Sequence, residues 1–247
     1  MTSYPAAPAR VEGAPLDERD LLHLERASRL LRTLDTRELL TGALPDTTPP
    51  QALDRLAAAC RIDHIALMVF ATGLDAARAA LTRRGMHGRP PFPSTVVRER
   101  VRRRSASSTA PAVHVLPIPL AGPGGCPREI EVFVLTDPQR RFDALARDER
   151  LHRLEDHLAV TTGLPAPRLP RLYTLVRDGC RLQPDGGGHN GSDGPAGRTV
   201  LYFSWARASA ATVGGRLPHR LELALPGRHE NLLRRHLAPA GGGAPAG

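Results

Sequence analysis

The sequence predicts an α+β protein, and three observations carry that prediction. Leucines recur at helical spacing between residues 16 and 40, separated by Arg, Asp and Glu. Residues 64–70 form a short, almost wholly apolar run, as in a buried strand. Strand-like runs return at 130–134 and 221–225, each with a glutamate inside it. Helical and strand-like segments therefore alternate along one chain.

The first half of the chain divides into four predicted segments. Residues 1–15 are rich in Pro and Ala and are expected to be a disordered tail. Residues 16–60 form a helical segment, with one or two amphipathic helices, a Pro-broken linker at 44–50 and a short helix up to residue 60. A strand at 64–70 and a helix at 75–84, which Gly85 ends, come next. Residues 96–104 alternate Val with Arg and allow a strand or a helix, and 114–120 and 129–135 are predicted strands.

The second half begins with a charged amphipathic helix at 137–155, which links two strand-rich regions. Short strands are predicted near residues 157–160, 199–205 and 219–225. The glycine-rich stretch 184–197 lacks a phosphate-loop ending and is predicted to be a flexible loop. Residues 227–247 are predicted to be a C-terminal helix and a flexible tail.

The two strand-rich regions, residues 61–136 and 156–226, can be laid over one another as a repeat. An Asp-His pair opens each region, with its histidine at His64 or His157. A glutamate follows in a late strand, 67 residues after His64 at Glu131 and 65 residues after His157 at Glu222. A repeated unit of this length is a stronger indication of architecture than any single local prediction.

Composition limits the classes of partner. The chain carries a net charge of +9, and all 34 basic residues are Arg, a bias typical of a GC-rich genome. Aromatic residues are only 4% of the chain, so a nucleic-acid interface built on base stacking is not expected. Arginine recognises carboxylate and phosphate groups well, which favours a small, anionic substrate.

The cellular setting is predicted from cysteines and apolar runs. The three cysteines form no Cys-x-x-Cys pair, as expected for reduced thiols in the cytoplasm. The first residues have no apolar stretch of the kind found in signal peptides, and no run approaches membrane-spanning length. The expected setting is therefore cytoplasmic, without a membrane partner, and a homodimer is compatible with the sequence.

Histidine and glutamate inside apolar strands point to a metal site. Burying a polar side chain is costly unless something binds it. Histidine and glutamate are residue types that hold a divalent metal. His64 and His157 lie near strand starts, and Glu131 and Glu222 lie in late strands.

The segment from Asp63 to Leu67, the helix after it and the strand around Glu131 resemble the vicinal oxygen chelate superfamily, which includes glyoxalases and extradiol dioxygenases. The resemblance covers residues 61–226. It implies two βαβββ modules that form a curved, open mixed sheet barrel, with residues 16–60 as an added helical segment. It also implies a divalent metal held by histidines of first strands and glutamates of last strands.

The resemblance implies specific roles. His64, His157 and Glu222 would be metal ligands, and Glu131 would be a fourth ligand or a general base. Three ligands favour Fe(II) and a non-haem oxygenase, a dioxygenase of specialised metabolism acting on a small metabolite. Four ligands would favour Ni or Zn and a glyoxalase-like isomerase or lyase. A metal-free protein of the same fold that binds or sequesters small molecules is the third hypothesis.

Each candidate also has an ordinary interpretation. His114 is a rival second ligand, because it begins a strand before Glu131. His157 continues the leucine spacing of the preceding helix and could lie on its surface. Glu131 could face solvent, and Glu222 could simply pair with an arginine. The arginines of 98–104 are expected to form a solvated face, with a lid over an anionic substrate as the functional alternative.

Overall fold

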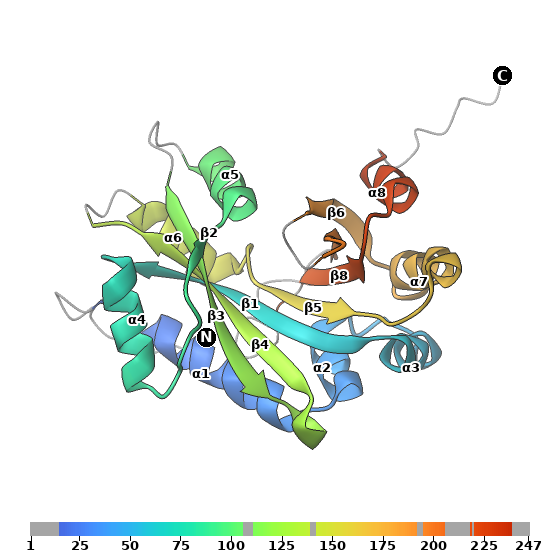
Figure 1. Ribbon diagram of the computed structural model, residues 1–247, viewed down its shortest axis with the longest axis horizontal. Coiled ribbons are helices and arrows are strands. Elements are labelled where there is room, and N and C mark those ends of the chain that lie inside the picture. The colour runs from blue at the N-terminus through green and yellow to red at the C-terminus, as the bar shows by residue number, and fades with distance from the viewer. Residues whose placement is uncertain are drawn as a thin grey trace, which may run out of the picture. The chain divides into compact units, whose positions relative to one another are not determined.

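The computed structural model describes residues 15–105, 111–138, 142–191, 195–205, 218 and 220–238, and these form a mixed α+β fold (Figure 1). The tail expected at 1–15 lies almost wholly outside the described residues, as do residues 239–247 of the helix and tail expected at 227–247. The helices are α1 Glu18–Thr33, α2 Thr36–Ala43, α3 Pro50–Ala59, α4 Leu74–Arg83, α5 Thr95–Arg104, α6 Asp143–His152, α7 Leu169–Thr174 and α8 Glu230–Leu237. The strands are β1 Arg61–Ala71, β2 Phe92–Pro93, β3 Ala112–Ala121, β4 Pro127–Thr136, β5 His157–Thr161, β6 Gln183–Asn190, β7 Arg198–Ser204 and β8 Arg220–Pro226.

All eight described strands belong to one sheet, in the order β2-β3-β4-β1-β5-β8-β7-β6. The sheet is mixed, because β5 runs parallel to β8 while β1 and β5, β7 and β8, and β6 and β7 pair antiparallel. The chain divides into two compact units, and β1 passes from one into the other. The first unit comprises Met1–Ser28, Leu67–Pro119 and Glu131–Glu155, and the second comprises Arg29–Ala66, Leu120–Ile130 and Asp156–Gly247.

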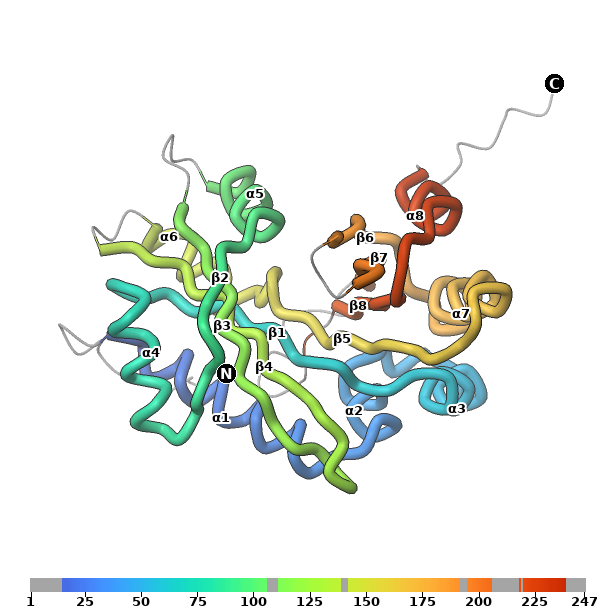
Figure 2. Tube along the Cα trace, viewed as in Figure 1, coloured from blue at the N-terminus to red at the C-terminus, as the bar shows by residue number. Residues whose placement is uncertain are grey.

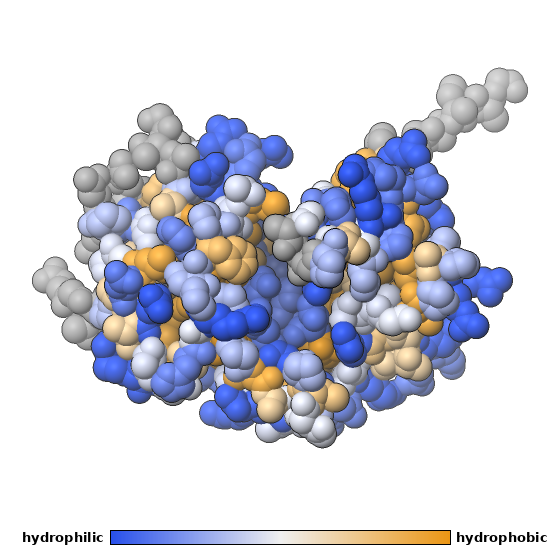
Figure 3. Space-filling view, viewed as in Figure 1, coloured by the Kyte–Doolittle hydropathy of each residue, from blue (hydrophilic) through white to orange (hydrophobic). Residues whose placement is uncertain are grey.

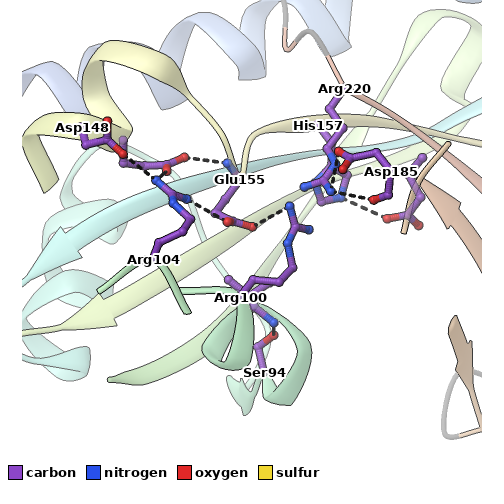
Figure 4. Close-up of polar contacts among 11 residues, drawn as sticks. Ser94, Arg100, Arg104, Asp148, Glu155, His157, Asp185 and Arg220 are labelled. Carbon is purple, nitrogen blue, oxygen red and sulfur yellow. Dashed lines mark hydrogen bonds and ion pairs between the residues drawn. The ribbon is translucent and has the colours of Figure 1, made fainter. Parts of the chain in front are cut away.

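In the first unit, helix α5 is fixed by buried ion pairs. Ser94 caps the helix by accepting a hydrogen bond from the Val97 amide. Near the other end, Arg104 donates to Glu149 and Glu155, whose carboxylates are fully buried, over 2.8 and 2.9 Å (Figure 4). Arg100 pairs with Glu155 at 3.2 Å. The expectation of a solvated face at 98–104 is therefore wrong for Arg100 and Arg104.

The other arginines of α5 match that expectation. Arg102 and Arg103 are exposed and pair with Glu99 of the same helix. Figure 3 shows hydrophilic residues gathered over α5. The last turn of α5 thus carries both exposed arginines and an arginine that pairs with buried carboxylates.

In the second unit, one face of the sheet packs against helices. Leu158, Leu221 and Phe203 lie side by side across β5, β8 and β7 and are fully buried. The Phe203 ring contacts Tyr173 of α7 and His236 of α8, with ring centroids 5.8 and 4.7 Å apart. This face is the hydrophobic core of the unit, and the opposite face carries the polar side chains considered below.

For the second unit, the alternative of a helical His157 and the expectation of a flexible glycine-rich loop are wrong. Helix α6 ends at His152 and Arg153 is left-handed, so His157 opens a strand and does not extend the helix. The glycine-rich stretch is not a flexible loop over its first half, because it forms the edge strand β6, which Figure 2 shows in orange before β7. A side chain at Gly187 would meet the Val200 carbonyl oxygen at 2.5 Å, so glycine is what allows β6 to pair so closely with β7.

Candidate metal centre

A β-bulge decides which face of the sheet His64 occupies. In the pairing of β1 with β5, Ile62 lies opposite Val160 and His64 opposite Ala159, so Asp63 is an extra residue. Opposed residues share a face, and the faces alternate along each strand. Without the bulge, His64 would lie opposite Leu158 and point into the core. With it, His64 points to the same face as His157.

Strand β8 brings Glu222 to the same face. Glu222 lies beside Ala159 in the parallel pairing of β5 with β8, two residues along β5 from His157. Tyr202 of β7 lies directly opposite Glu222, and its ring meets the His157 ring edge to face at 5.4 Å. Four strands therefore contribute side chains to one spot on the polar face.

Three side chains converge there from β1, β5 and β8. The Nε2 atoms of His64 and His157 are 3.4 Å apart. The Glu222 Oε2 atom lies 3.1 Å from His157 Nε2 and 4.0 Å from His64 Nε2. All three residues are buried, with 2 to 5% of their surface exposed. Among the residues that the structure describes, they are the group that could hold a metal ion.

The size of this triangle fits a metal ion. The three distances define a triangle whose centre is about 2.1 Å from each corner, within the roughly 2.0–2.2 Å of metal bonds to imidazole nitrogen and carboxylate oxygen. The geometry of the donor atoms therefore suits a divalent ion.

The electrostatics of the group also suit a cation. Burial would raise the pKa of Glu222, but hydrogen bonds from His157 and Tyr202, and the positive charge that the two histidines carry when protonated, outweigh burial and lower it. The carboxylate therefore stays ionised at neutral pH, and an ionised carboxylate is the form that binds a metal.

A second carboxylate stands behind His64. Asp63 Oδ2 lies 3.3 Å from His64 Nδ1, and Arg198 of β7 donates to the same oxygen over 2.6 Å. Burial would raise the pKa of Asp63, but hydrogen bonds and charges from His64 and Arg198 dominate and hold it well below its usual range. Asp63 is thus a hydrogen-bond acceptor and not a donor.

The remaining sequence candidates belong to the first unit. His114 lies on β3 and Glu131 on β4, both half-buried, and neither is a member of the three-residue group. The expected contributions of Glu131 as fourth ligand or base, and of His114 as rival ligand, stay predictions.

The donor set fits a divalent transition metal. Two neutral imidazoles and one carboxylate are ligands for Fe(II), Zn or Ni, whereas Mg and Ca prefer oxygen alone. Three protein donors also leave coordination positions for other molecules. The described residues thus form a candidate centre of the two-histidine, one-carboxylate kind.

Comparison with known proteins gives no family for this chain, since no family model, curated protein or solved structure matches it. No helix in the described part of the chain is long and apolar enough to cross a membrane.

Sequence reasoning missed two residues around the group. These are Arg198 and Tyr202, and neither lies in a recognisable sequence motif. A correct register of β7 against β8 would have revealed Tyr202, because it places this residue opposite Glu222. Nothing in the sequence points to the pairing of Arg198 with Asp63, which lies 135 residues away along the chain.

Proposed function

We propose that this protein is a cytoplasmic metal-dependent enzyme, a non-haem Fe(II) oxygenase that acts on a small, anionic metabolite. The observation that carries the proposal is the convergence of His64, His157 and Glu222 around one point at metal-bonding distance. Two histidines and one carboxylate are the ligand set of non-haem Fe(II) oxygenases. The group has three described donors and not four, which favours an oxygenase over the glyoxalase-like isomerase or lyase.

Each residue of the group would have its own role in metal binding. His64 and His157 would each present a neutral Nε2 to the ion, and Glu222 would supply the negative charge, with Tyr202 holding its carboxylate by a hydrogen bond. When bound, Fe(II) supplies Lewis acidity and the redox chemistry that O₂ requires. Glu131, which belongs to the first unit, stays a predicted fourth ligand or general base.

The order of elements supports the resemblance to the vicinal oxygen chelate superfamily. Strand β5, helix α7 and strands β6, β7 and β8 follow one another in the strand-helix-three-strand order that the resemblance implies for residues 156–226. Residues 61–136 show β1, α4, β2, β3 and β4 in that order, with α5 inserted before β3. We propose that these segments are the two modules.

The test of this function combines metal content with oxygen uptake. Protein purified without oxygen is expected to retain about one Fe(II) per chain and to consume O₂ with small carboxylate-bearing substrates. Tight Zn or Ni without oxygen consumption would contradict an oxygenase and favour the isomerase or lyase. Glu131→Gln is expected to keep the metal and lose turnover, whereas strong loss of metal would make Glu131 a fourth ligand.

A metal-free small-molecule binding protein is the second candidate. One observation favours it: His157 can donate directly to Glu222 over 3.1 Å, so part of the group is hydrogen-bonded without an ion. Elemental analysis separates the two candidates. A protein that holds no metal above background, and whose thermal stability is the same with and without EDTA, would be a binding protein.

A further inference from the structure

We propose that Asp63 and Arg198 are positioning residues that aim the Nε2 lone pair of His64 into the candidate metal centre. The inference rests on the proposed function, because it assigns a supporting pair to that same centre. Its basis is a chain of contacts in the second unit, from Arg198 to Asp63 over 2.6 Å and from Asp63 to His64 Nδ1 over 3.3 Å.

The chemistry of the contact fixes the tautomer of His64. A carboxylate accepts hydrogen bonds and cannot donate them, so it can pair with Nδ1 only if that nitrogen carries the hydrogen. A neutral imidazole has one N–H, so Nε2 must then be bare. A bare Nε2 is the form that binds a metal, and metal-binding histidines usually donate their other ring N–H to such a partner.

The bulge in β1 makes this arrangement possible. Asp63 is the extra residue of the bulge, and the same irregularity that turns His64 toward the polar face leaves a carboxylate next to its ring. One local feature therefore supplies both the ligand and the group that orients it.

Arg198 holds the carboxylate in place from a distant strand. It begins β7, and two strands, β5 and β8, lie between β7 and β1 in the sheet. The contact is half-buried on both sides.

The first experiment determines the tautomer directly. Long-range proton–nitrogen NMR spectra of ¹⁵N-labelled, metal-free protein are expected to show His64 protonated at Nδ1, with its signal assigned by its absence from His64→Ala. In Asp63→Asn the amide can donate to Nδ1, so the Nε2–H form should gain population. A wild-type His64 protonated at Nε2 would overturn the inference.

The second experiment measures Zn(II) affinity by competition with a chelator. Asp63→Asn is expected to bind roughly 10–100-fold more weakly than wild type, the usual effect of losing a partner of a ligand. Arg198→Met is expected to weaken binding in the same direction by a smaller factor, and it tests the inference if Asp63→Asn does not fold. The matched control is Asp54→Asn, which breaks the exposed 2.7 Å pair with Arg37 and is expected to leave affinity unchanged.

The outcomes separate this inference from the proposed function. Wild-type protein that binds no Zn(II) would overturn the metal centre itself. Wild-type protein that binds Zn(II), with Asp63→Asn equally tight, would overturn the positioning role alone. Lower melting temperatures for both Asp63→Asn and Arg198→Met, without a change in tautomer or affinity, would show a merely structural ion pair and would also overturn it.

Discussion

At the scale of single residues, burial controls the chemistry of the three cysteines. Burial raises the pKa of Cys60 to about 12, with a further contribution from Cys180, and raises the pKa of Cys180 to about 11. The thiolate is the reactive form, so both thiols are expected to be inert in the folded protein. Cys126 is exposed.

Thiol titration with a disulfide reagent at pH 8 checks this difference. One thiol per chain is expected to react quickly in the native protein, and all three in denaturant. Cys126→Ser is expected to abolish the fast reaction, with Cys60→Ser as the control that leaves it intact. Rapid modification of two or three thiols in folded protein would contradict the burial of Cys60 and Cys180.

Asp17 is expected to make the free energy of unfolding depend on pH. Burial would raise the pKa of this carboxyl, but hydrogen bonds from the Arg19 side chain and backbone and the charge of Arg150 lower it from 3.8. A depressed pKa adds stability above the unfolded-state pKa, and that stability disappears as pH falls through the folded-state pKa. Asp17→Asn should therefore be less stable than wild type at pH 6, and the difference should shrink below pH 4. A constant difference in the free energy of unfolding from pH 6 to pH 3 would contradict this account.

At the scale of elements, helix α5 is held by the half-buried Arg104. Arg104 is 23% exposed and pairs with the buried carboxylates of Glu149 and Glu155, whereas Arg103 is 72% exposed and pairs with the exposed carboxylate of Glu99. Removing one partner of a buried ion pair costs about 3–5 kcal/mol, and a surface pair contributes about 0–1 kcal/mol.

Denaturant unfolding of two neighbouring variants tests this contrast. Arg104→Met is expected to lower the free energy of unfolding by about 3–5 kcal/mol, and Arg103→Met, the matched control, by less than about 1 kcal/mol. Equal effects of the two substitutions would show that α5 does not depend on the buried carboxylates.

Some of these elements could be predicted from apolar periodicity and others could not. Apolar periodicity was sufficient for α1 and for the strand from His64 to Phe70, because burial alone decides those patterns. It failed for β6, where glycine permits a close backbone contact that no side-chain pattern records. It also failed for the bulge at Asp63, since strict alternation would place Ile62 and His64 on one face.

At the scale of the whole molecule, the high arginine content is partly internal. Arg128 is buried and donates to the carbonyls of Leu31, in the last turn of α1, and of Leu34, just after the helix. Arg150 pairs with buried Asp20. Arg220 is buried and pairs with Asp185 (Figure 4). The net charge of +9 is therefore weak support for an anionic partner, and the candidate metal centre carries more of the functional argument.

The spacing of two histidines and two glutamates suggested a metal site, and the family resemblance selected His64, His157 and Glu222 as its ligands. The structure brings these three together. The sequence could not distinguish them from His114, because the choice depends on strand order and register. Nor could it predict Arg198 and Tyr202, which enter through contacts between distant strands.

The central claim is that His64, His157 and Glu222 bind one divalent metal ion. Anaerobic titration with Fe(II), followed by native mass spectrometry, tests it most directly. Wild-type protein and the control His152→Ala, an exposed histidine on α6, are expected to bind one ion per chain. At a hundredfold excess over Kd, binding should raise the free energy of unfolding by about 2.7 kcal/mol. His64→Ala is expected to stay folded and bind none. Wild-type protein that binds no ion, or His64→Ala that binds as tightly as wild type, would contradict the claim.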